Sequence, residues 1–221
     1  MADLTLGYWK IRGLAEPIRY LLHYLNINFK DEYYECGPAP NYNRESWLSV
    51  KFKLDLDYPN LPYLLDGELK LTESNAILRY ICEKYKPELL GETLKEKAYV
   101  NMAVGVLGDL GYAKSTLMYR GRDVEGNQGL KDTMKNKLTY LNTLLGKNKF
   151  IAGDKLTYAD FILAESTESI NELLEPIFTE FSNLKRHFDS ICELPNVQKY
   201  RKERTPLPFN NKMAKLGGSL L

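Results

Sequence analysis

The chain has 221 residues, 44% of them hydrophobic, and 30 basic residues nearly balance 29 acidic ones for a formal net charge of +1. This length suits one large or two small domains. The balanced charge gives no electrostatic footprint for nucleic acid or for an anionic membrane, so neither is expected as a partner. The N-terminus lacks a signal-like region and no apolar run approaches transmembrane length.

Cysteine and histidine are scarce. The three cysteines, Cys36, Cys82 and Cys192, are too few and too scattered for a disulfide framework, which favours a reducing cytoplasmic location. Only His23 and His187 are present, so the sequence gives poor support to a histidine metal site or a Ser-His-Asp triad. We expect no bound metal and no permanently bound cofactor.

The first 35 residues predict a strand, a helix and a second strand. Residues 4–9 form a short apolar run ending in aromatic residues, and apolar residues recur at helical spacing over 14–25, with Pro17 in the first turn. Residues 29–35 read as the second strand. Such a βαβ unit predicts parallel strands joined by a right-handed crossover.

The stretch 58–79 predicts a proline turn, a hairpin and a helix start. Pro62 precedes an apolar run, and Asp66-Gly67 signals a two-residue hairpin between two short strands. We expect a cis Leu61–Pro62 peptide, because X-Pro is the only common place for a cis bond and such a bond would turn the backbone of Leu61 toward a ligand. Thr72-Glu73-Ser74 then opens a helix whose N-terminus could hold an anion. Taken alone, an ordinary strand start and helix cap explain this stretch better.

After a linker at 86–92, only helices are predicted. The first helix covers 95–119 and is weakened by three glycines, and the second covers 130–145. A third helix is opened by a Thr157–Asp160 capping box, and two further helices are expected around 180–193 and 196–204. We therefore expect a domain over 1–88, an all-helical domain over 90–212, and a tail over 213–221. A short helix or irregular turn is expected at 44–51.

The pattern resembles a known family. An α/β thioredoxin-like N-terminal domain followed by an all-α C-terminal domain is the arrangement of the cytosolic glutathione transferases. Where thioredoxins carry Cys-x-x-Cys, this chain has Tyr8-Trp-Lys-Ile11, which excludes disulfide exchange there. The resemblance spans nearly the whole chain and is closest to the mu class, in the segments Leu6-Gly-Tyr-Trp-Lys-Ile-Arg-Gly-Leu-Ala15, Gly37-Pro-Ala-Pro-Asn-Tyr-Asn-Arg44, Trp47-Leu48, Lys51-Phe-Lys-Leu54 and Tyr58-Pro-Asn-Leu-Pro-Tyr63.

The resemblance implies that Tyr8 is catalytic and donates a hydrogen bond to the sulfur of glutathione, the co-substrate. A phenol is neutral at pH 7, so it donates without adding negative charge. A donor to the thiolate lowers the thiol pKa below its free value of about 8.5. The alternative is a Tyr8-Trp9 pair that packs at a strand end.

The resemblance also implies which residues bind glutathione: Trp9, Leu14, Arg44, Trp47, Lys51, Asn60, Leu61, Glu73 and Ser74, with Asp109 supplied by the partner subunit. Indole and ammonium groups are donors only, which suits the glycyl carboxylate. The mu pattern usually has Gln at position 73, so the carboxylate of Glu73 is a departure. Asp109 and the aromatic Tyr58 imply a homodimer, although each could also be an ordinary surface residue.

The electrophile pocket is expected to include Tyr119, Gly111, Tyr112 and Asn211. Gly111 replaces a common histidine and Asn211 a common serine or threonine, which puts the electrophile preference in doubt. The implied function is conjugation of glutathione to apolar electrophiles in detoxification. A non-catalytic ligand carrier and a glutathione-dependent isomerase are the alternatives, and retention of Tyr8 argues against loss of catalysis because phenylalanine would pack equally well.

Overall fold

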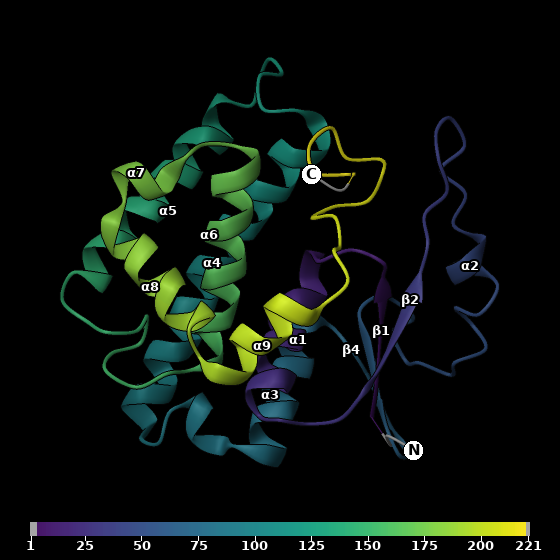
Figure 1. The fold of residues 1–221 in the computed structure, drawn as a ribbon, viewed down its shortest axis with the longest axis horizontal. Helices are drawn as coiled ribbons and strands as arrows, with labels where there is room; N and C mark the ends of the chain where they lie inside the picture. The colour runs from purple at the N-terminus through teal and green to yellow at the C-terminus, as the bar shows by residue number, and fades with distance from the viewer. Residues whose placement is uncertain (1–3, 220–221) are drawn as a thin grey trace.

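A computed structural model describes residues 4–219 and contains one mixed sheet flanked by helices (Figure 1). The strand order is β2-β1-β3-β4. β1 (Leu4–Trp9) runs parallel to β2 (Lys30–Tyr34) and antiparallel to β3 (Tyr63–Asp66), which pairs antiparallel with β4 (Leu69–Thr72). The predicted parallel βαβ unit is confirmed.

The hairpin between β3 and β4 lies one residue later than predicted. Asp66 still pairs with Leu69, so the two loop residues are Gly67 and Glu68. Gly67 has φ +61°, a conformation that glycine adopts without steric cost. The Leu61–Pro62 peptide is cis, as expected, and the Ala39–Pro40 peptide is also cis, which the sequence pattern does not indicate.

Helices cover the sheet on the side that faces the second half of the chain. The predicted helix over 14–25 is a 3-10 turn, η1 (Gly13–Ala15), followed by α1 (Glu16–Tyr24). Residues 44–51 hold only one short helix, α2 (Glu45–Leu48), while α3 (Ser74–Tyr85) follows β4 directly. In Figure 1, α1 and α3 stand between the sheet and the helical half.

The second half is helical, as predicted, with two additions. A 3-10 helix lies in the expected linker, and a short helix begins after Pro176, whose restricted φ suits a helix start. The three glycines do not interrupt the long fourth helix. The elements are η2 (Pro87–Leu90), α4 (Leu94–Arg120), α5 (Gln128–Leu145), α6 (Tyr158–Leu173), α7 (Ile177–Glu180), α8 (Ser182–Cys192) and α9 (Pro195–Glu203).

α6 is the central helix of this half and is buried on nearly every face. The capping box at its start is confirmed, because Asp160 accepts from the backbone N–H of Thr157 at 2.8 Å. The same carboxylate also accepts from the Ile151 N–H at 2.8 Å and contacts His187 Nε2 at 2.9 Å. One buried group therefore holds a loop and a second helix to the start of α6.

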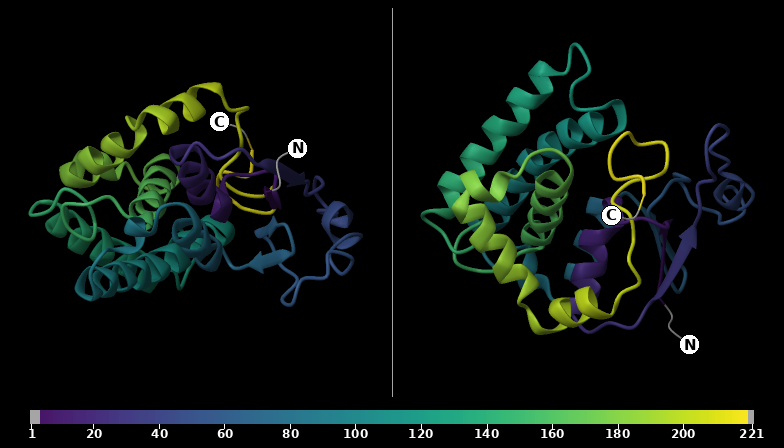
Figure 2. Two further views of the ribbon diagram at one scale, coloured as in Figure 1. Left: turned by 90° about the horizontal axis from the view of Figure 1, so that it is seen from below. Right: turned by 45° about the horizontal axis from the view of Figure 1, so that its top comes forward.

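The chain after α9 returns to the first half. The backbone N–H groups of Arg12 and Gly13 donate to the carbonyls of Pro208 and Phe209 at 2.9 and 3.1 Å. Figure 2 shows this segment beside the start of α1 in both views. The Leu216 N–H donates to the Met118 carbonyl at 3.1 Å, so the described part of the predicted tail is fastened to α4. Within residues 4–219, no helix is long and apolar enough to cross a membrane.

Candidate active site

A cavity of about 430 Å³ separates the turn after β1 from α4 and α6. Six of the residues that the sequence analysis singled out line it, namely Tyr8, Leu14, Ser74, Gly111, Tyr112 and Tyr119. The first three come from the α/β half and the last three from α4. The predicted thiol-activating residue and most of the predicted electrophile-binding residues therefore meet at one cavity.

Tyr8 lies at the end of β1 with only 6% of its surface exposed. Its hydroxyl oxygen accepts from the Leu14 backbone N–H at 3.2 Å. Burial is the largest influence on the pKa of Tyr8 and raises it to about 12, although the Leu14 N–H lowers it. The phenol is therefore neutral at physiological pH, and its own O–H is available as a donor.

Gly13 allows the chain to approach the Tyr8 hydroxyl closely. A Cβ at this position would lie 2.8 Å from the hydroxyl oxygen, and the backbone has φ +43°. Both features favour glycine here. The turn carrying Gly13 then presents the Leu14 N–H to Tyr8.

The N-terminus of α3 reaches the same cavity through Ser74 and Asn75. Glu73 precedes the helix with φ +68°, and its side chain makes no capping hydrogen bond. The ordinary side-chain cap that the sequence allowed at Thr72–Ser74 is therefore wrong. The first N–H groups of a 12-residue helix are left for another acceptor, which suits an anionic ligand group.

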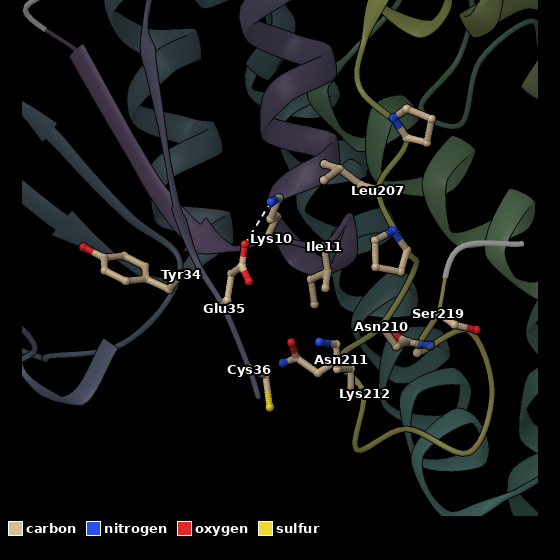
Figure 3. Close-up of a pocket in the computed structure, with 13 residues that line it drawn as sticks. Lys10, Ile11, Tyr34, Glu35, Cys36, Leu207, Asn210, Asn211, Lys212 and Ser219 are labelled. Carbon is tan, nitrogen blue, oxygen red and sulfur yellow. Dashed lines mark hydrogen bonds and ion pairs between the residues drawn. The ribbon is translucent and has the colours of Figure 1, made fainter. Parts of the chain in front are cut away.

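A second cavity of about 490 Å³ lies beside the first and shares Ile11 and Asn210 with it. Asn211 lines this second cavity, opposite Cys36, as Figure 3 shows. The backbone N–H of Asn211 donates to the Tyr119 hydroxyl at 3.4 Å, which joins the walls of the two cavities. The sequence analysis did not assign Cys36 or Asn210 to a site, because they lie in a loop and in the returning segment, where no periodic pattern indicates a role.

The other predicted glutathione-binding residues do not line either cavity. Trp47 is 5% exposed and packs against Tyr34 and Tyr63, with ring centroids 5.2 and 6.1 Å away. Leu61 is buried, and Glu73 and Asp109 are exposed. The Asp109 carboxylate pairs with Lys137 Nζ of its own chain at 2.7 Å. The remaining predicted residues are partly buried or exposed: Trp9, Arg44, Lys51 and Asn60.

A charged group that the sequence analysis missed lies in the turn after β1. Arg12 is 4% exposed and donates to the carboxylates of both Glu165 and Glu168 on α6. Glu165 also lines the first cavity, together with Lys114 of α4. These partners are about 150 residues apart in sequence, so no local pattern could have indicated the pairing.

Comparison with known proteins gives a consistent result. Residues 4–83 match the family described as "Glutathione S-transferase, N-terminal domain", and residues 112–204 match "Glutathione S-transferase, C-terminal domain". The chain is 37% identical to a glutathione S-transferase of Dermatophagoides pteronyssinus over 99% of both chains. It is 39% identical to glutathione S-transferase Mu 3 of Homo sapiens over 98% of this chain and 96% of the relative.

A solved structure gives the same assignment for the fold. The Pi-class glutathione S-transferase of Onchocerca volvulus superposes with a TM-score of 0.82 at 28% identity, covering 97% of this chain and all of the other. The matches extend over both halves, so the thioredoxin-like and helical parts are recognised together. With this fold, these relatives and a tyrosine at the cavity wall, the chain belongs to the glutathione S-transferase family and resembles its mu class.

Proposed function

We propose that this protein activates the thiol of glutathione through Tyr8 and transfers the thiolate to an apolar electrophile. The observation that carries the proposal is the buried, neutral Tyr8 hydroxyl at the cavity wall, with its oxygen bonded to the Leu14 N–H. The O–H donates to the sulfur and favours the charged form of the thiol. The thiol proton leaves to solvent, the sulfur attacks carbon, and the leaving group departs with the electron pair of its bond.

Glutathione, in this proposal, lies along the edge of the α/β half as a co-substrate that is released with each turnover. Its γ-glutamyl carboxylate meets the uncapped start of α3 at Ser74, and Glu73 meets the ammonium. Leu61 offers its backbone to the cysteinyl part, beside Asn60. Trp47 and Lys51 donate to the glycyl carboxylate. Trp9, Leu14 and Arg44 complete this site.

In this proposal, the two halves of the chain bind different substrates. Residues 1–88 form the glutathione-binding domain, residues 90–212 form the domain that carries most of the electrophile pocket, and 213–221 form the tail. Gly111 supports the pocket assignment, because a Cβ built there meets nothing within 4 Å. We place the protein in the cytoplasm, which is consistent with its three free cysteines.

Conjugation of glutathione to 1-chloro-2,4-dinitrobenzene by the purified chain tests this function. Release of chloride with formation of the thioether, at a rate well above the uncatalysed reaction, is the expected result. Tight glutathione binding without turnover of any electrophile would instead favour a ligand carrier. Turnover limited to a double-bond migration that consumes no glutathione would favour an isomerase on the same fold.

We predict that Tyr119→Phe affects electrophiles selectively. The lost hydroxyl borders the first cavity and accepts the Asn211 N–H at 3.4 Å, so substrates that use a donor at this wall lose rate while others are spared. The measurement is kcat/KM for a panel of haloarenes, enones and epoxides at saturating glutathione. An equal loss for every electrophile, with weakened glutathione binding, would place Tyr119 in the fold rather than in the pocket.

We also propose that the chain forms a homodimer. Tyr58 is 77% exposed in the single chain although it is a large aromatic residue, and such a ring is a strong anchor when a partner provides a pocket. A two-fold interface repeats each contact, so Asp109 of each subunit would reach the glutathione of the other. The surface position of Asp109 on α4 is compatible with this role.

The dimer predicts different results for two surface variants. Tyr58→Ser is expected to weaken the dimer, because it removes the ring that the partner subunit would bury. Asp109→Asn is expected to weaken glutathione binding while the dimer persists, because it removes one charge partner of the ligand. Sedimentation at micromolar concentration and glutathione titration measure the two effects separately. A fully active wild-type monomer would contradict both parts.

A further inference from the structure

One charged side chain on the cavity wall has no role in the chemistry described above. Lys114 and Glu165 are the charged residues that line the 430 Å³ cavity. The carboxylate of Glu165 is bonded to Arg12, and that of Glu168 to Arg12 and, at 2.7 Å, to Arg201. The carboxylates of α6 near the cavity are therefore already paired with arginines.

Lys114, in contrast, has a neutral hydrogen-bond partner. Its Nζ donates to the Ser169 hydroxyl at 3.0 Å, and no carboxylate within residues 4–219 lies at ion-pairing distance from it. Burial is the largest influence on its pKa and lowers it, Glu165 raises it and Arg12 lowers it further. An ammonium has three donors, so two remain for another acceptor.

The surroundings of Lys114 leave room for that acceptor. Gly111 lies one helical turn before it on the same wall, and a Cβ built at Gly111 meets nothing within 4 Å. Ser115 and Ser166 line the same cavity. A negatively charged group that enters past Gly111 can therefore replace the water lost by the partly buried ammonium.

We propose that Lys114 selects electrophiles that carry an anionic substituent, such as a carboxylate, by pairing with that substituent at the cavity wall. This inference rests on the proposed function, because Tyr8 and its bound thiolate occupy the same cavity. The anionic end of the substrate lies against α4 and α6, and its electrophilic carbon faces the sulfur. A charged hydrogen bond in a partly buried site is stronger than one in water.

Two electrophiles that differ only in charge test the proposal. 4-Chloro-3,5-dinitrobenzoate is anionic, and its methyl ester is neutral with the same ring and leaving group. We expect Lys114→Met to lower the acid-to-ester ratio of kcat/KM by about tenfold or more, the effect of one charged hydrogen bond. The two electrophiles differ in intrinsic reactivity, but this difference is the same for wild type and variant. It therefore cancels when their acid-to-ester ratios are compared.

Two further variants serve as controls. Lys114→Arg keeps a cation at the cavity and is expected to retain most of the wild-type ratio. Lys95→Met removes one positive charge from an exposed position near the start of α4 and is expected to leave the ratio unchanged. Activity with the ester also reports that each variant is folded.

The outcomes separate this inference from the proposed function. If wild type conjugates neither compound, the proposed function fails. If it conjugates the ester but Lys114→Met leaves the ratio unchanged, the proposed function stands and the selectivity role of Lys114 is wrong. A rise in KM for glutathione that is equal with both electrophiles would also overturn the proposal, since Lys114 would then hold glutathione.

Discussion

Replacing Tyr8 with phenylalanine is expected to lower kcat for glutathione conjugation by about a hundredfold or more, the usual effect of removing one donor to a developing or bound anion. The ring stays in place, because Tyr8 is buried at the end of β1 and phenylalanine has the same shape. Only the O–H is lost, together with the acceptor of the Leu14 N–H. Glutathione affinity should change little, since the donor favours the thiolate rather than the bound tripeptide.

The effect of Tyr8→Phe on the rate is expected to depend on pH. The hydrogen bond stabilises the thiolate, so its loss raises the pKa of bound glutathione toward the free-thiol value of about 8.5. The difference between wild type and Tyr8→Phe should therefore be largest at pH 6–7 and narrow as the pH rises. Tyr140→Phe, at an exposed position on α5, is the matched control. If Tyr8→Phe keeps full kcat at neutral pH while the chemical step is rate-limiting, Tyr8 does not activate the thiol.

Replacing Arg12 with methionine is expected to lower the free energy of unfolding by about 3–5 kcal/mol, the cost of breaking a buried ion pair from one side. Arg12 donates to Glu165 and Glu168, and its guanidinium carbon lies 4.1 Å from the centre of the Phe209 ring. Glu168 keeps Arg201, whereas Glu165 loses the arginine that compensates its buried charge. Urea titration at one fixed protein concentration measures the loss.

Two controls make the cause of this loss specific. In Arg12→Met, burial without the Arg12 guanidinium raises the pKa of Glu165 in the folded state further above its unfolded value. Folding then binds a proton, so the deficit should shrink as the pH falls from 8 toward 5. Adding Glu165→Gln to Arg12→Met removes the orphaned charge and should restore part of the stability. If the loss of unfolding free energy changes neither with pH nor with the added Glu165→Gln substitution, its cause is lost packing against Phe209 instead.

Local periodicity and turn chemistry determined the order and type of the main elements. The apolar run of β1, the helical spacing before residue 25 and the Thr157–Asp160 capping box each depend on residues close in sequence. The hairpin register shifted by one residue, because Gly67 rather than Asp66 takes the positive φ in the turn. The proposal that Tyr8 activates the thiol depended on a family motif, because local physics alone allows a Tyr8-Trp9 pair that packs at a strand end.

Only the tertiary structure decided what surrounds that tyrosine. Arg12 and Glu165 are separated by 153 positions, and Tyr119 meets the Asn211 N–H across 92 positions. The uncapped start of α3 and the empty space at Gly111 are also properties of packing rather than of composition. Sequence determines each element because its hydrogen bonds are local, whereas burial and charge at a cavity depend on which distant side chains packing brings together.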